Sequence, residues 1–230
     1  MRTLFLIPLL AGSVASAVAV DGVDGLKGIS LTFDVISYAS QEFSVGYMSD
    51  HWSSGQRYEL NAVTQLDGDR VRPSGGMYFF FEDRDWKGKF FTGVGGTTQE
   101  RANMETWGFG LQGGATIHLI EPEKKLWLAL VPLFRAGLGF VDFEAKDVVI
   151  DNARYDLQSG SGRIELAAGL DLRLTLAQRF EVVFGGGVDY WSAADVAIYA
   201  GTGGGGIAVG SNGTFTGTDA YVRFGVGLHF

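Results

Sequence analysis

The sequence predicts an all-β protein, a transmembrane antiparallel up-and-down β-barrel of eight strands in one domain. Three observations support this fold class. Long runs alternate apolar and polar residues with a period of two, and their connections are short and long in turn. In addition, no segment after the N-terminal stretch has enough consecutive apolar residues for a membrane helix. The C-terminal runs also exceed the roughly 5 to 6 residues of soluble strands and suffice for the about 9 to 11 that cross a bilayer.

The composition narrows the possible function classes. Of 230 residues, 35 are glycine and 4 are proline, and 46% are apolar, which excludes a disordered chain, a collagen and a proline-rich linker. Cysteine is absent, which excludes disulfides, cysteine-based metal sites and a lipid-anchored cysteine. The net charge of −8 and the scattered basic residues speak against nucleic acid as a partner. We expect no cofactor and no bound metal.

The N-terminus has the pattern of a secretory signal peptide. Arg2 supplies a positive charge, Leu4–Ala11 form a short apolar run, and Ala15–Ala17 give an Ala-x-Ala cleavage pattern. The apolar run ends well before the roughly 20 residues that a membrane helix requires. We therefore expect a signal peptide over residues 1–17, with cleavage after residue 17 or residue 19, and a single barrel domain over 18–230.

The alternation places eight strands along the chain. They are predicted at residues 41–50, 56–66, 75–86, 104–119, 125–142, 161–176, 179–192 and 218–230. Residues 28–38 also alternate, and we expect them to extend the first strand or to lie inside the barrel. If these residues and 89–95 both formed strands, the total would be ten, which is again even.

The two faces of the strands predict the membrane and the lumen. Between Arg163 and Leu176, isoleucine, leucine and alanine occupy one face, while the other carries arginine, glutamate, aspartate and glycine. Short connections are predicted near 121–125 and 177–178, and long loops near 87–103, 144–160 and 193–216. Aromatic residues at the ends of the apolar faces predict two girdles, with Trp107, Phe140 and Tyr190 on the long-loop side and Phe180 and Phe230 opposite.

The inward face predicts a filled lumen. An eight-stranded barrel is only wide enough for side chains, and the charged inward residues comprise Glu59, Glu82, Arg84, Arg135, Arg163, Glu165, Asp171, Arg173, Glu181, Asp189 and Arg223. Opposite charges confined to the interior of a barrel should pair, because an unpaired buried ion is costly. We therefore predict an ion-pair network that plugs the barrel. Inward glycines leave a narrow polar channel as the alternative, although glycine also serves barrel curvature.

The C-terminus resembles the assembly signal of bacterial outer-membrane barrels. In the last eight residues, Arg223, Gly225, Leu228 and Phe230 occupy its polar, glycine, hydrophobic and terminal aromatic positions. The resemblance implies a small barrel of the OmpA/OmpX-like kind in the bacterial outer membrane, recognised by the barrel assembly machinery. The stretch Val45–Trp52 is similar to a first-strand pattern, Gly-Tyr-x-Ser-Asp followed by an aromatic, of small outer-membrane proteins that have no agreed activity.

One short motif could carry catalysis. His51 and Ser53 resemble the His-x-Ser arrangement of outer-membrane lipid A deacylases, in which a histidine activates a serine nucleophile. Positions two apart point the same way on a strand, and Glu59 on the neighbouring strand could be the acid. In that family the motif lies late in the chain, whereas here it lies near the N-terminus. We therefore favour a non-enzymatic protein.

The functional prediction follows from these patterns. We expect a monomeric integral outer-membrane barrel that contacts outer-membrane lipid, anchors the chain and displays long extracellular loops, whose partner the sequence does not identify. The alternatives are a narrow passive pore for small solutes or ions and a lipid A deacylase-like hydrolase.

Overall fold

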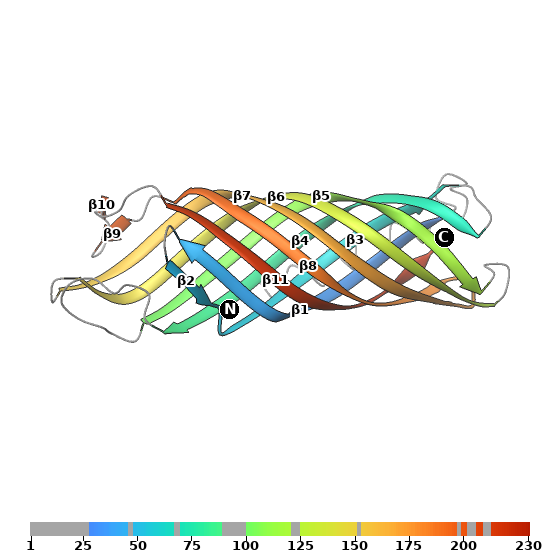
Figure 1. The fold of residues 1–230 in the computed structure, drawn as a ribbon, viewed down its shortest axis with the longest axis horizontal. Coiled ribbons are helices and arrows are strands. Elements are labelled where there is room, and N and C mark those ends of the chain that lie inside the picture. Colours follow the sequence, from blue (N-terminus) through green and yellow to red (C-terminus); the bar gives the residue numbers. More distant parts are fainter. Residues whose placement is uncertain are drawn as a thin grey trace.

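The computed structural model describes residues 28–45, 48–66, 70–88, 100–120, 125–150, 153–196, 199–201, 206–208 and 213–230. Eight long antiparallel strands close into a barrel (Figure 1). They are β1 (Ile29–Val45), β3 (Ser54–Gln65), β4 (Val71–Gly88), β5 (Glu100–Ile120), β6 (Leu126–Ile150), β7 (Ala153–Leu176), β8 (Phe180–Val196) and β11 (Gly213–His229). The predicted up-and-down barrel is thus confirmed, and residues 89–95, on which a ten-strand barrel depended, lie outside the described residues.

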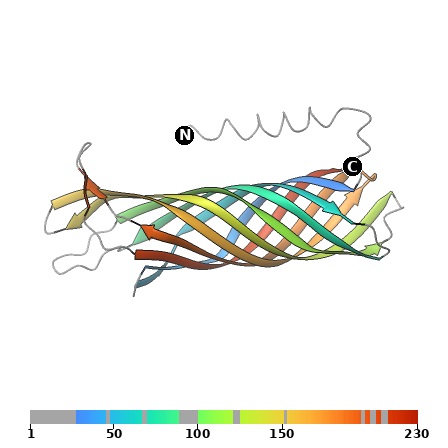
Figure 2. The same ribbon diagram turned by 90° about the horizontal axis from the view of Figure 1, so that it is seen from above.

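Three short strands accompany the barrel. They are β2 (Met48–His51), which pairs with β1, β9 (Tyr199–Gly201), which pairs with β7, and β10 (Gly206–Ala208), which pairs with β9. Figure 2, seen from above, shows the eight strands tilted against the long axis and wound around a common interior. No helix in these described ranges is long and apolar enough to cross a bilayer.

The barrel closes where its last strand meets its first. β11 pairs with β1 from Ser30 opposite His229 to Val45 opposite Phe215. Beyond the ladder, the Gly28 amide donates a hydrogen bond to the Phe230 carbonyl over 2.5 Å. The end of the barrel that holds Gly28 and Phe230 is called the terminal rim, and the opposite end the far rim.

The described connection at the terminal rim is a tight turn. Ala177 and Gln178 both have positive φ, at 51° and 61°, which is the backbone of a type I′ hairpin. The Arg179 amide then donates to the Leu176 carbonyl over 3.1 Å. The short connection predicted between these two strands is confirmed, although neither central residue is glycine.

The strands continue further toward the far rim than the sequence predicted. The loop expected at 144–160 is largely wrong, because β6 runs to Ile150 and β7 starts at Ala153. Parts of 87–103 and 193–216 are also strand, since β4 ends at Gly88 and β8 ends at Val196. Outside a bilayer a strand needs no apolar face, so the alternation ends while the backbone ladder continues. The period of two therefore marks the membrane-facing section and not the strand.

The predicted bounds of the first strand also need correction. The strand predicted at 41–50 is wrong, because β1 covers Ile29–Val45 and β2 then runs back along it, with Glu42 opposite His51. The alternating residues 28–38 supply most of the first barrel strand. They pair with β3 on one side, where Asp34 lies opposite Glu59, and with β11 on the other.

The outer surface carries the apolar side chains. On β7, Leu166 and Leu170 are 58% and 48% exposed, whereas Arg163 and Glu165 on the opposite face are 1% and 4% exposed. Large exposed apolar residues continue around the barrel, including Phe79, Phe109, Leu111, Phe134, Leu138, Phe184, Val222 and Phe224. A closed sheet with an apolar outside has no unpaired edge in lipid, which is the condition for spanning a bilayer with strands.

The apolar band ends in an aromatic row on the far side. Tyr58, Phe81, Trp107 and Phe140 lie in register across β3, β4, β5 and β6, and the rings of Trp107 and Phe140 are 6.1 Å apart. The next outward row, two residues further along each strand, holds Gln56, Asp83, Glu105 and Asp142. Such a change from aromatic to acidic side chains marks the edge of the hydrocarbon region.

Candidate functional site

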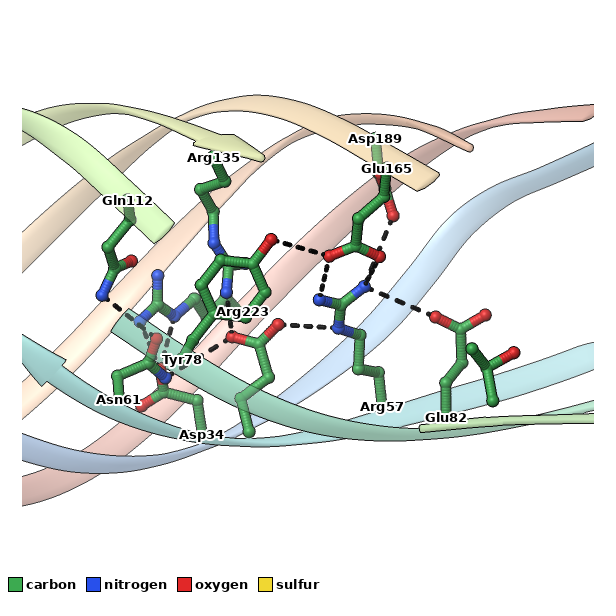
Figure 3. A network of polar contacts seen from close by, with 12 residues as sticks. Asp34, Arg57, Asn61, Tyr78, Glu82, Gln112, Arg135, Glu165, Asp189 and Arg223 are labelled. Carbon is green, nitrogen blue, oxygen red and sulfur yellow. Dashed lines mark hydrogen bonds and ion pairs between the residues drawn. The ribbon is translucent and has the colours of Figure 1, made fainter. Parts of the chain in front are cut away.

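The interior of the barrel is a chain of buried charges. Among the described residues, six arginines and eight carboxylates lie inside and are at most 5% exposed. The arginines are Arg57, Arg84, Arg135, Arg163, Arg173 and Arg223, and the carboxylates are Asp34, Glu59, Glu82, Glu165, Asp171, Glu181, Asp189 and Asp219. Figure 3 shows how side chains from opposite walls meet on the axis.

Toward the far rim, two arginines share one glutamate. Arg84 donates through Nε to Glu82 and through Nη1 to Asp219, both over 2.5 Å. Arg163 reaches the same Glu82 oxygen over 2.8 Å from the opposite wall. The indole nitrogen of Trp191 donates to Asp219 over 2.9 Å. Charge-assisted hydrogen bonds of this length hold four strands together across the lumen.

Arg57 occupies the centre of the network. Its two terminal nitrogens donate to the two Glu165 oxygens over 2.6 and 2.7 Å, a bidentate pair, and its Nε lies 2.7 Å from Glu59. Arg135 also donates to Glu59, over 2.5 Å. The Tyr78 hydroxyl donates to Glu165 over 2.8 Å, and its ring lies under the Arg135 guanidinium at 3.9 Å (Figure 3). Fixed planar pairing of this kind is specific to arginine.

The network continues toward the terminal rim through an amide. Asn61 donates to Asp34 over 2.8 Å and lies 3.4 Å from Glu59, which links the central group to the next one. Arg223 bonds Asp34 through Nε over 2.6 Å and reaches Asp171 over 3.0 Å. The last pair in this direction is Arg173 with Glu181, at 3.0 Å.

Aromatic contacts between β6 and β11 cross the lumen at both ends of the network. At the far end, the rings of Phe143 and Phe215 are 5.5 Å apart. At the terminal end, Trp127 lies between His118 and His229, with ring centroids 5.2 and 5.3 Å away. β6 and β11 are separated by two strands in the closed sheet, so these contacts span the interior. The charged section is therefore flanked by aromatic contacts at each end.

Inward glycines make room for the large lumen side chains. A Cβ at Gly137 would lie 2.6 Å from the Tyr78 hydroxyl and 2.9 Å from Glu165. A Cβ at Gly217 would collide with the Trp191 indole, and one at Gly225 with Asp34. The space at these glycines is filled by neighbours, so it does not add up to a channel.

The structure brings the predicted lumen residues together, with three additions. Every charged residue that the sequence placed inside is buried there. Arg57, Asp34 and Asp219 were missed, although each could have been found by extending the alternation. Arg57 shares the face of Glu59, Asp219 shares the face of Arg223, and Asp34 lies in residues 28–38, which were expected to extend the first strand or to lie inside the barrel.

The residues proposed for catalysis are not assembled into a triad. Ser53 is exposed at the far rim, where its hydroxyl donates to the Asp85 carbonyl over 2.7 Å. Glu59 is 1% exposed and paired with Arg57 and Arg135 in the lumen. Ser53 and Glu59 are six positions apart along an extended chain, about 20 Å at the usual rise. The backbone of His51 belongs to β2, and its side chain lies outside the described residues. Glu59 therefore does not orient Ser53.

The C-terminal signature residues have structural positions of their own. Arg223 pairs with Asp34 and Asp171, and Gly225 leaves the space that Asp34 occupies. Phe230 closes the ladder through its amide, which donates to the Ile29 carbonyl over 2.9 Å. No group of histidines and acids in the described part of the chain is arranged to hold a metal ion. The predicted signal peptide lies outside the described residues.

Comparisons with known proteins found similar solved structures but no family. No family model matches the sequence, and no curated protein matches it. Ail, the attachment invasion locus protein of Yersinia pestis, is 16% identical over 89% of this chain and 99% of its own, with a TM-score of 0.39. Neisserial surface protein A is 11% identical over 86% of this chain and 96% of its own, with a TM-score of 0.38. A major outer-membrane protein from Thermus thermophilus is 12% identical over 85% of this chain and 99% of its own, with a TM-score of 0.42.

The outer and inner surfaces of the barrel are those expected of a membrane-spanning protein. The molecule is a closed barrel with an apolar outer band, an aromatic edge and an ionic interior, and its last strand ends on an aromatic residue. The chain is a closed β-barrel with the surfaces of a barrel that spans a membrane. Its lumen, and not a surface cleft, is the site where its charged side chains gather.

Proposed function

We propose that the chain is a small bacterial outer-membrane barrel, a closed, non-enzymatic and monomeric anchor that carries strand extensions and loops beyond the outer leaflet. The observation that carries the proposal is the filled lumen. Opposite charges occupy its middle, and the Phe143–Phe215 and Trp127–His229 contacts cross it at either end. A solute would have to break buried ion pairs to pass, which is costly.

The display role is supported by the length of two strands. β6 continues past Phe140, the last aromatic of the outer band, to Ile150, and β7 begins at Ala153 beside it. In bacterial outer-membrane barrels the longer connections face the outside of the cell. The far rim is accordingly the extracellular one. The C-terminal strand is in turn the segment that the barrel assembly machinery would read.

Conductance in planar bilayers tests the closed lumen. We expect the purified, folded protein to give no unitary current steps, whereas a general porin in the same bilayer gives them. Heat-modifiable migration on a gel verifies that the sample is a folded barrel. Reproducible steps from folded protein would contradict the proposal and favour the narrow pore. In that case Phe143→Ala with Phe215→Ala would change the step size, and Phe109→Ala with Phe134→Ala on the outer surface would not.

A further inference from the structure

We propose that the lumen contains a proton-binding site at Asp189, whose carboxyl group is neutral in the folded barrel at neutral pH. The site lies on β8, in the middle of the charged network, and nothing in the proposed anchoring role requires it. Its ligand is one proton, taken from water when the chain folds.

Asp189 differs from its neighbours in how it is paired. The four other carboxylates of the central and far sections, Glu59, Glu82, Glu165 and Asp219, each lie 2.5 to 2.6 Å from a guanidinium nitrogen. The nearest guanidinium nitrogens to Asp189 are 3.6 Å away on Arg57 and 3.7 Å away on Arg163. Its Oδ1 has no hydrogen-bond partner, although the residue is only 3% exposed.

Glu165 explains why Asp189 is poorly paired. Both carboxyl groups face Arg57 from neighbouring strands (Figure 3). Glu165 takes both terminal nitrogens of Arg57 and also lies 3.3 Å from Arg163. Asp189 therefore lies only at 3.6 to 3.7 Å from nitrogens of the same two arginines. Two ionised carboxylates that share partners repel each other, and a proton on one of them removes that repulsion.

The charge count also leaves room for a proton in this part of the network, although the whole lumen, with eight carboxylates and six arginines, has two unmatched negative charges. Across the central and far sections, five buried carboxyl groups face four guanidinium groups, which leaves one negative charge unmatched. The five are Glu59, Glu82, Glu165, Asp189 and Asp219, and the four are Arg57, Arg84, Arg135 and Arg163. Aromatic contacts cross the lumen at both ends of the network. An unmatched buried charge is far more costly than a bound proton.

Two of the other polar groups around the small cavity that Asp189 lines, Tyr38 and Arg135, have partners of their own. Tyr38 on β1 donates its hydroxyl to Glu82 on β4. Arg135 on β6 is held by Glu59, and Tyr221 on β11 lines the same small cavity as Asp189. Tyr38, Arg57, Arg135, Glu165 and Tyr221 surround this cavity, which is about the size of one water molecule. A cation other than a proton would lie against two guanidinium groups there.

The proposal predicts the sign of a pH effect. An aspartate in the unfolded chain is ionised at neutral pH, so the folded barrel holds one proton more than the unfolded chain. Stability then falls as pH rises, by about tenfold in the folding equilibrium constant per pH unit while the difference lasts. Asp189→Asn replaces a neutral acid with a neutral amide of the same shape, so the variant should lose this pH dependence.

Two matched variants test the proposal in urea unfolding of the refolded barrel. Asp189→Asn should leave the unfolding midpoint at neutral pH unchanged or raise it. Glu165→Gln, which breaks the bidentate pair with Arg57, should lower the folding equilibrium constant on the order of a hundredfold. Equal destabilisation by both variants would overturn the proposal, because Asp189 would then be an ionised partner. A wild-type stability that does not fall between pH 6 and pH 9 would overturn it too.

Infrared spectroscopy of the folded wild-type protein is a second test that needs no stable variant. A protonated carboxyl group in an apolar setting gives a separate C=O stretching band, distinct from that of carboxylates. We expect this band at neutral pH and its loss in Asp189→Asn. If the wild type lacks the band, no lumen carboxyl group is neutral and the proposal fails, whatever the bilayer recordings show.

Discussion

The two faces of the same strands obey different chemistry. On β7, Leu166 and Leu170 face outward next to Arg163, Glu165 and Asp171, which face inward. Outside, each apolar side chain is stabilised by lipid independently of its neighbours. Inside, each charge depends on one or two specific partners. The outer face should therefore tolerate apolar exchange and reject charge, whereas the inner face should tolerate neither the loss nor the gain of a charge.

Removing the central cation should have the largest effect. Arg57→Met leaves Glu165 and Glu59 without their shared partner, and breaking a buried pair typically costs about 3 to 5 kcal/mol. Urea unfolding in detergent or lipid measures the change. Arg179, exposed in the turn at the terminal rim, is the control, and Arg179→Met should change stability by less than about 0.5 kcal/mol. Equal effects would remove the distinction between the lumen and the surface.

A charge on the outer face should come next. Leu166→Arg places a cation among acyl chains, at a cost of about 2 to 4 kcal/mol near the middle of the bilayer. Asp142→Arg, beyond the aromatic row, should cost no more than about 1 kcal/mol, because that position lies at or above the interface. Unfolding from vesicles gives both values. A Leu166→Arg variant as stable as the wild type would show that this face does not contact lipid.

Glycine substitutions should distinguish the inner from the outer face with a smaller effect on stability. Gly137→Ala brings a methyl group against Tyr78 and Glu165 in the lumen, and overpacking of this kind costs about 1 to 3 kcal/mol. Gly162→Ala points outward, with no atom within 4 Å of the added Cβ, and should be close to neutral. The difference between the two unfolding free energies is the readout. A neutral Gly137→Ala would mean that the lumen has spare volume, which a narrow pore would need.

The smallest effect is expected at the far rim. His51→Ala and Ser53→Ala should leave the acylation of lipid A unchanged in cells that express the protein, because Ser53 is engaged with the Asp85 carbonyl and Glu59 is buried in the network. Mass spectrometry of extracted lipid A measures this. Loss of a deacylated species in either variant would revive the hydrolase interpretation.

The sequence predicted the fold through the face that meets lipid. Alternation of leucine with charge around Leu166 gave the strand, its facing and the turn at Ala177. It could not give the far ends of β6 and β7, because residues such as Glu144, paired with Gln158, continue the ladder beyond the apolar band. Polar composition there was interpreted as loop, although hydrogen bonding to a neighbouring strand does not depend on side-chain polarity.

The sequence predicted most of the charged residues that face the lumen, but it did not predict which arginine pairs with which acid. Parity places Glu82, Arg163 and Glu165 inside, yet which arginine meets which acid depends on barrel shear and on contacts between opposite walls. The central role of Arg57 and the isolated position of Asp189 arise from those contacts. Sequence neighbours do not reveal them, since Arg57 and Glu165 are far apart in the chain.

Quenching of tryptophan fluorescence by lipids with brominated acyl chains tests the central claim most directly. Trp107 is 61% exposed on the outer face and Trp191 is 0% exposed in the lumen. If apolar side chains face lipid and charges fill the interior, Trp107→Phe should abolish a large share of the quenched intensity and Trp191→Phe should leave it unchanged. Quenching that depends on Trp191 and not on Trp107 would contradict the account.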